Sequence, residues 1–266
     1  MYVMRKIGLF VIVAFLLLAC NHVEEGPILF DSATADKVVQ LSNEENSPVC
    51  KVHLQVQYAT EENGHKAEVV NRVIQEKLLN LTDLDMQLAV DSFANTYTNT
   101  YLQNFLPLYN EDRADEEKRS WYDYHYVITS QIQAGREDTS VFLADIDYYE
   151  GGAHGISQQL ILNFNNKTGL LLTLDDIFVP GYENKLNAIL TQSLCEKVGA
   201  DDINDLHQKG YLFSMDMFPA QNFVINDETI TFVYNPYEIA SYDKGSTQLT
   251  IALRELEPIL IPEFMP

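Results

Sequence analysis

The sequence predicts an α+β fold: a mainly antiparallel sheet with helices packed on one face, divided into two closely associated subdomains. Three observations support this prediction. Several segments alternate apolar and polar residues as half-buried strands do, short turns join consecutive strands, and three longer segments carry the 3.6-residue apolar period of helices. With 266 residues, 46% of them hydrophobic, the chain is long enough to bury a sizeable core.

The amino terminus is typical of a bacterial lipoprotein signal peptide. Arg5 and Lys6 form its positive region, residues 10–18 form a short apolar core, and Leu17-Leu18-Ala19-Cys20 is a small-residue cleavage site that ends in cysteine. We expect removal of residues 1–19 and attachment of acyl chains, such as palmitate, to Cys20, which would hold the domain at a membrane. An ordinary secretory signal with a chance cysteine is the alternative. Asn21 is not the aspartate expected of inner-membrane retention, which favours the outer membrane.

The chain is strongly acidic, with a net charge of −22. Removal of residues 1–19 takes away two positive charges and no acid, so the mature charge becomes −24. Such a field repels nucleic acid and anionic lipid headgroups and favours cationic proteins or metal ions. We therefore expect no nucleic-acid partner. Solubility alone is the simpler explanation of the acidity.

Residues 20–49 are polar and contain proline and glycine, so we expect a flexible tether there. An N-terminal α+β subdomain is predicted over residues 50–149, beginning with an alternating strand at 51–59. Two amphipathic helices follow at 66–79 and 85–106. The aromatic stripe of the second helix has the spacing of core packing, and we expect Pro107 to end or kink this helix.

Two alternating strands, at about 122–132 and 140–149, are joined by a turn at 134–138. A symmetrical hairpin brings His125 near Asp147, with Asp123 and Asp145 on the same face. A metal site or an acid/base pair could be built from these groups, but a cross-strand ion pair on the surface is the simpler interpretation.

A glycine-rich turn separates the second of these strands from the next strand, at 156–164. It reads Glu150-Gly151-Gly152-Ala153-His154-Gly155, and glycine permits the backbone angles of a shaped turn. A later aromatic turn carries Tyr237 and Glu238. We expect His154 and Glu238 to lie close enough to pair. The candidate binding or structural site therefore comprises six residues: Glu150, Gly151, Gly152, His154, Tyr237 and Glu238.

The C-terminal α+β subdomain is predicted over residues 150–266. Thr173 and Asp176 have the spacing of a capping box for a short helix that ends near residue 178. A long helix follows at 183–198, then a hairpin of strands at 222–225 and 229–234, a strand at 247–252 and a short helix at 253–261.

Cys50 and Cys195 remain once Cys20 is acylated. A disulfide between them could persist in an oxidising compartment. Cys195 lies roughly opposite Leu186 on its predicted helix, away from the apolar face. We expect two unpaired thiols, with a Cys50–Cys195 bridge as the alternative.

Three segments in order resemble the motifs of one bacterial envelope family: residues 148–155, residues 165–169 with 172–178, and residues 232–240 with Gly245. This domain-of-unknown-function family includes the extracellular region of the RsiV anti-sigma factor and also occurs joined to a peptidoglycan deacetylase. The resemblance implies an extracytoplasmic module, and for RsiV-like members it implies lysozyme binding. This chain shows no sigma-binding segment and no deacetylase domain, so the resemblance implies neither of those activities. Ser241 stands where the family often has proline.

These inferences predict a lipid-anchored cell-envelope binding protein of unassigned ligand, without a cofactor or resident metal. A cationic protein such as lysozyme, or a cell-wall fragment, is the expected partner. The alternative is an envelope hydrolase or metal-dependent enzyme acting on cell-wall material, with Glu150, His154 and Glu238 as acid/base groups or metal ligands. The sequence contains no nucleophile elbow, zinc-binding helix or phosphate loop, so we do not expect an enzyme.

Overall fold

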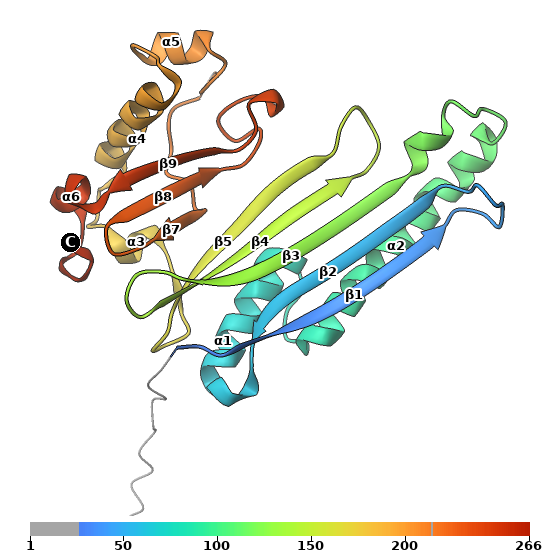
Figure 1. The fold of residues 1–266 in the computed structure, drawn as a ribbon, viewed down its shortest axis with the longest axis horizontal. Coiled ribbons are helices and arrows are strands. Elements are labelled where there is room, and N and C mark those ends of the chain that lie inside the picture. Colours follow the sequence, from blue (N-terminus) through green and yellow to red (C-terminus); the bar gives the residue numbers. More distant parts are fainter. Residues whose placement is uncertain (1–26, 214) are drawn as a thin grey trace, which may run out of the picture.

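The structure is a computed structural model that describes residues 27–213 and 215–266. It contains two sheets (Figure 1). Six strands form the larger sheet in sequence order: β1 (Phe30–Gln40), β2 (Val49–Ala59), β3 (Tyr124–Ala134), β4 (Thr139–Tyr149), β5 (Ile156–Asn165) and β6 (Leu171–Leu172). The smaller sheet contains β7 (Phe223–Ile225), β8 (Thr229–Tyr234) and β9 (Thr247–Ala252). All neighbouring strands are antiparallel except β2 and β3, which are parallel. The predicted α+β class is confirmed.

The predicted tether is wrong from residue 30 onward, because β1 is an edge strand of the larger sheet. It pairs with β2 along its whole length, from Phe30 opposite Ala59 to Gln40 opposite Val49. Within β1 only Ala33 and Ala35 are buried. Backbone hydrogen bonds form the strand without a row of large apolar side chains, so its sequence resembles a linker. Cys20 and the signal peptide lie outside the described residues.

Two helical segments connect β2 to β3 and cover one face of the larger sheet (Figure 1). Helix α1 (His65–Ile74) continues into a π-helical turn at Gln75–Leu79, and helix α2 (Met86–Asp112) follows. The carboxylate of Asp85 caps α2 by accepting from the backbone N–H groups of Gln87 and Leu88. Helix α2 packs against β1 and β2.

Helix α2 passes through Pro107, so the predicted end at this proline is wrong. A proline inside a helix removes one backbone hydrogen bond. Pro107 is exposed, and water can hydrate the carbonyl that loses its donor. The helix therefore continues for one more turn.

The predicted boundary at residues 149 and 150 is also wrong. Strands β5 and β6 belong to the larger sheet, and Phe164 on β5 is buried in the same core as Val52 and Leu54 on β2. The first subdomain therefore extends to about residue 172. Its hydrophobic core lies between the sheet and the two helices.

The second subdomain begins with α3 (Leu174–Ile177), which carries the predicted capping box between Thr173 and Asp176. Helix α4 (Glu183–Val198) packs against β9, and α5 (Ile203–Gln208) and α6 (Leu253–Leu256) complete the unit. A separate core includes Leu186, Leu190 and Phe232. The bounds of α4 and β9 agree with the sequence prediction.

The two sheets meet where β7 lies beside β5. Val141 and Ile161 from the larger sheet and Val233 from the smaller sheet form a small buried cluster between them. The amide of Asn163 donates to the carbonyl of Phe223 at 2.7 Å. The subdomains are therefore closely associated, as predicted. Over the described residues, every helix is too short or too polar to span a bilayer.

Candidate functional site

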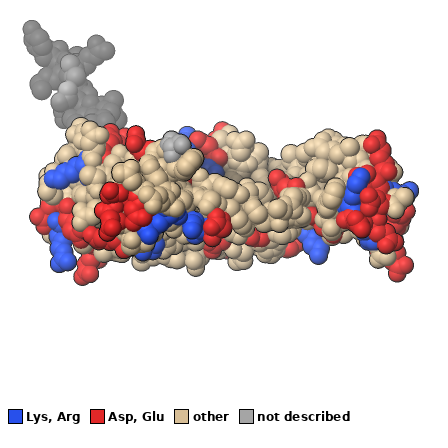
Figure 2. Space-filling view, turned by 90° about the horizontal axis from the view of Figure 1, so that it is seen from above, with Lys and Arg blue, Asp and Glu red and all other residues tan. Residues whose placement is uncertain are grey.

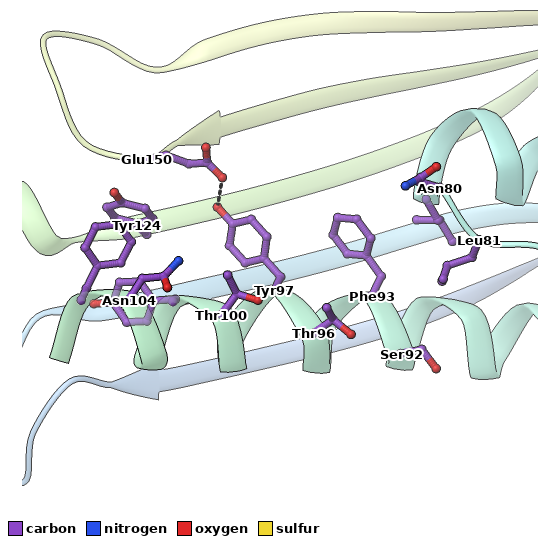
Figure 3. Close-up of a pocket in the computed structure, with 13 residues that line it drawn as sticks. Asn80, Leu81, Ser92, Phe93, Thr96, Tyr97, Thr100, Asn104, Tyr124 and Glu150 are labelled. Atoms are coloured by element: carbon purple, nitrogen blue, oxygen red, sulfur yellow. Dashed lines mark hydrogen bonds between the residues drawn. The ribbon is translucent and has the colours of Figure 1, made fainter. Parts of the chain in front are cut away.

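A groove of about 610 Å³ opens between α2, residues 79–81, the start of β3 and the end of β4 (Figure 3). Five aromatic side chains line it: Phe93, Tyr97, Tyr101, Phe105 and Tyr124. Hydroxyl and amide groups also line it, from Ser92, Thr96, Thr100, Asn80 and Asn104. Among the lining residues that the structure describes, Glu150 is the one with a carboxylate. Ligand sites commonly combine apolar walls with a few polar groups in this way.

The aromatic walls of the groove follow from the period of α2. Residues four apart share one helix face, so Phe93, Tyr97, Tyr101 and Phe105 lie on the same side of α2. Phe93 and Tyr97 point toward the sheet (Figure 3), and the rings of Tyr101 and Phe105 pack on Tyr124 of β3. Tyr97 and Tyr126 have ring centroids 5.0 Å apart, and Phe105 and Tyr124 have centroids 4.8 Å apart. These distances are typical of favourable aromatic pairs. The stripe that the sequence predicted as core therefore packs on the sheet and also lines an open groove.

Glu150 lies directly after β4 and reaches back over the groove to α2. Its carboxylate accepts a hydrogen bond from the Tyr97 hydroxyl at 2.8 Å. Burial raises the pKa of Tyr97 far above its ordinary value, and the hydrogen bond to Glu150 raises this pKa further. Tyr97 therefore remains a neutral donor at physiological pH.

The negative charge of Glu150 also raises the pKa of other groups near the aromatic cluster. The pKa of Tyr124 is raised first by burial and then by Glu150, and the same two causes raise the pKa of Cys50 to about 12. Among the described residues, no lysine, arginine or histidine forms an ion pair with Glu150. The groove therefore carries an uncompensated negative charge.

The glycine turn has the backbone shape that its sequence predicts. Gly151 and Gly152 have φ values of 83° and 94°, in the region that favours glycine. A Cβ atom on Gly151 would lie 3.2 Å from the carbonyl oxygen of Trp121. The turn joins β4 to β5 as an antiparallel pair that begins with Tyr148 opposite Ile156.

The predicted pair of His154 and Glu238 is replaced by contacts with two tyrosines. The Nε2 atom of His154 lies 3.4 Å from the Tyr237 hydroxyl, and its ring stacks on Tyr242 with centroids 3.6 Å apart. Glu238 turns inward, and its carboxylate accepts from the backbone N–H of Asn235 at 2.8 Å. The described residues show no ion pair between His154 and Glu238. The glycine turn does contact the loop after β8, through Tyr237.

His125 and Asp147 form the surface pair that is the simpler interpretation of their spacing. The Nε2 atom of His125 lies 2.9 Å from Asp147, although the backbone register places His125 opposite Tyr149. The side chains are 43% and 53% exposed. The hydrogen bond from Ser157 and then the pair with His125 lower the pKa of Asp147. Asp145 instead accepts from the Gln159 amide, and Asp123 accepts from the backbone N–H of Val49.

Cys50 and Cys195 are both free thiols. Cys50 is fully buried in the core of the first subdomain, whereas Cys195 packs against the core of the second. The alternative of a disulfide between them is wrong for this structure. In the described part of the chain, no three histidine, cysteine, aspartate or glutamate side chains are arranged to hold a metal ion.

Acidic side chains gather toward both ends of the elongated molecule on the face shown in Figure 2. Most of the surface between these ends is uncharged on that face. Lysine and arginine side chains are interspersed with the acids, but the acids outnumber them by 39 to 17 over the whole sequence. A cationic partner would therefore be attracted over a long range.

These features define a two-domain α+β protein with an aromatic groove between its long helix and its larger sheet. Residues 175–254, which run from α3 into α6 of the second subdomain, match the model of the family described as "Protein of unknown function (DUF3298)".

Two solved structures are similar over most of the chain. A member of the DUF3298 family from Bacteroides fragilis is 25% identical, with a TM-score of 0.80, over 88% of this chain and 94% of that one. A DUF3298 family protein from Pseudomonas aeruginosa has the same fold, at 17% identity and a TM-score of 0.61, over 91% of this chain and 98% of that one. No curated protein matches the sequence.

Sequence reasoning identified Glu150 but placed it with the wrong partners. It grouped Glu150 with His154 and Glu238, whereas the structure places it over α2 beside Tyr97. The groove residues Asn80, Thr96, Thr100 and Asn104 were missed. The signal for the three residues on α2 is the row of small polar residues beside its aromatic stripe, at positions 92, 96, 100 and 104, whereas Asn80 lies before the helix and outside this row.

Proposed function

We propose that this chain is a lipid-anchored binding protein of the bacterial cell envelope. Its proposed ligand is a cationic protein such as lysozyme, or a cell-wall fragment. The observation that supports this proposal is the groove with aromatic walls. Among the described residues, no basic side chain forms an ion pair with the Glu150 carboxylate in this groove. An open groove of this kind in an acidic domain suits a ligand that brings both positive charge and apolar surface.

The location is part of the proposal. The sequence of residues 1–20 favours cleavage before Cys20 and acylation of that thiol, and Asn21 favours the outer membrane. The resemblance of three motifs to the RsiV-like family supports an extracytoplasmic role, and lysozyme binding is the property which that resemblance suggests.

Binding is favoured over catalysis by the composition of the groove. Glycoside hydrolysis commonly uses two carboxyl groups on either side of the scissile bond. The described lining of the groove contains one carboxylate, that of Glu150, and its hydroxyl partner Tyr97 stays protonated. We therefore propose that the domain retains its ligand unchanged.

A retention experiment tests this function. The full-length chain in detergent is immobilised and presented with lysozyme and, separately, with soluble peptidoglycan fragments. We expect retention of at least one of them, with weaker retention of lysozyme as salt is raised. Mass spectrometry of the recovered fragments tests for turnover. Failure to retain either ligand, or cleavage of the fragments, would contradict the proposal.

A further inference from the structure

We propose that the groove beside α2 is a receptor for a basic side chain, lysine or arginine, presented by a cationic protein. Glu150 is its counter-ion, and the partly exposed rings of Tyr97, Phe105 and Tyr124 are its walls. This inference rests on the proposed function, because it names the group by which a cationic ligand would be held.

The first argument is the state of the Glu150 carboxylate. Its described hydrogen-bond partner is the Tyr97 hydroxyl, a neutral donor that binds Oε1 at 2.8 Å. A carboxylate can accept several hydrogen bonds, and cationic donors give the strongest ones. The Tyr97 bond fixes the direction of the carboxylate over the groove, as Figure 3 shows. Glu150 is therefore oriented for a cation before any ligand arrives.

The second argument is the chemistry of the walls. A lysine ammonium or an arginine guanidinium is attracted to the face of an aromatic ring within about 6 Å of its centroid. Phe105 and Tyr124 are both partly exposed, and their rings have centroids 4.8 Å apart and tilt against each other by 53°, so they offer faces in different directions. The aliphatic part of a basic side chain can pack on the same rings. The walls therefore suit both parts of such a side chain.

The third argument is the polar border of the groove. Asn104 and Thr100 lie on α2 beside the aromatic stripe, and Asn80 lies toward the other end of the groove (Figure 3). Amide and hydroxyl groups can hydrogen-bond the backbone of a polypeptide that brings the side chain. A groove of about 610 Å³ is within the usual size range of ligand pockets. The site can therefore hold the side chain together with part of its peptide backbone.

Charge distinguishes this ligand from a neutral sugar. A sugar ring can also stack on aromatic side chains, but it leaves the Glu150 charge without a counter-ion. A net charge of −22 also favours the approach of a basic protein over that of a neutral glycan. We therefore assign the groove to a basic polypeptide segment.

The test compares one charged and one neutral probe on the full-length chain in detergent. Isothermal titration calorimetry is carried out with tetralysine and with the same peptide acetylated at all four Nε atoms. The variants are Glu150→Gln, which keeps an acceptor for Tyr97 but removes the charge, and Tyr97→Phe, which keeps the ring. Glu255→Gln is the matched control, because it removes one exposed charge from α6, which lies in the second subdomain.

We expect tetralysine to bind and the acetylated peptide to bind at least about tenfold more weakly. Glu150→Gln should weaken tetralysine binding by about tenfold, whereas Glu255→Gln should change it less than about twofold. Tyr97→Phe should weaken binding by a smaller factor than Glu150→Gln, because it releases the carboxylate without removing the charge. Circular dichroism of each variant checks that the fold is intact.

The same variants separate this inference from the proposed function. If lysozyme binds the wild type and Glu150→Gln equally well, the groove assignment is overturned while the binding function stands. Equal binding of the charged and acetylated peptides would also overturn it. If the wild type binds neither tetralysine, lysozyme nor wall fragments, both proposals fail.

Discussion

The side-chain amide of Asn235 pairs with both backbone groups of Gln159. Its oxygen accepts from the Gln159 N–H at 2.8 Å, and its nitrogen donates to the Gln159 carbonyl at 3.0 Å. Asn222 repeats this arrangement by accepting from the N–H of Ile161 and donating to the carbonyl of Gln159. Two side chains from the second subdomain therefore satisfy backbone groups on β5, much as a neighbouring strand would.

Replacement of Asn235 should therefore weaken the junction of the two sheets. We expect Asn235→Ala to lower the free energy of unfolding by about 1–3 kcal/mol, because it leaves the partly buried Gln159 N–H without its acceptor and removes one of the two donors to the Gln159 carbonyl. Asn235→Asp keeps an acceptor for the N–H in both forms, but only the protonated acid has an O–H that can replace the lost donor, so its effect should be smaller at pH 4 than at pH 7. Urea unfolding at pH 4 and pH 7 measures both variants. An unchanged midpoint for Asn235→Ala would contradict this role.

Glu238 should make the stability of the protein depend on pH. Burial raises the pKa of its carboxyl group above the ordinary value of 4.5, and the N–H of Asn235 offsets only part of this rise. A raised pKa in the folded state means that the contribution to stability is full below pH 4.5 and is lost as pH rises through the folded value.

Glu238→Gln removes this charge and retains an acceptor for Asn235. Its stability relative to wild type should therefore increase from pH 4 to pH 7, as followed by urea unfolding. Glu255→Gln, at an exposed position, controls for the general loss of one negative charge. A difference between Glu238→Gln and wild type that stays constant across this range would show that the carboxyl titrates normally.

The two free cysteines should react at different rates in the folded protein. Cys50 is fully buried, and burial followed by the charge of Glu150 raises its pKa to about 12. Cys195 is partly exposed, and its pKa is raised by burial and then by Asp202. Because the thiolate is the reactive form, we expect slow alkylation of Cys195 and much slower alkylation of Cys50 at pH 8. Denaturation without reductant should expose both thiols to the reagent, whereas a disulfide would leave neither of them available.

Cys20 should be the attachment to the membrane. We expect a Cys20→Ala variant to leave the membrane fraction, because it removes the acceptor of the acyl chains. Cell fractionation measures the membrane association directly. Sensitivity of the signal-peptide processing to globomycin measures the cleavage step. Cys195→Ala is a matched control that should stay in the membrane fraction. Continued membrane association of Cys20→Ala would show that another part of the chain attaches the protein.

Elements with a strong local pattern could be predicted from the sequence. Helix α4 and strand β9 alternate buried and exposed positions at the expected periods, and Thr173 and Asp176 form the predicted capping box. The hairpin of β3 and β4 followed from its alternation and its short turn. In each case the information lies within a few residues of the element itself.

Strand β1 and helix α2 show where local pattern fails. The buried side chains of β1 belong to Ala33 and Ala35, so pairing with β2 rather than side-chain hydrophobicity defines the strand. Pro107 is a strong local signal for a helix end, yet α2 continues past this exposed proline, and the buried Tyr109 in the next turn packs on Tyr122. Tertiary contacts outweighed local propensity at both places.

The sequence indicates individual residues of the candidate site but does not predict that they come together. Glu150 and the aromatic stripe of α2 are visible in the sequence, but they are 53 residues apart at the bond between Tyr97 and Glu150. Their meeting depends on β4 ending above α2 in the larger sheet. No periodicity in the sequence encodes that relationship, so Glu150 was assigned to the nearer histidine instead.

A crystal structure of the chain with tetralysine would show where a basic side chain binds. We expect a lysine side chain in the groove, with its ammonium nitrogen within about 4 Å of the Glu150 carboxylate and its methylene groups against the rings of α2. A bound peptide located elsewhere on the molecule, with the groove free of any basic side chain, would refute the assignment of the groove.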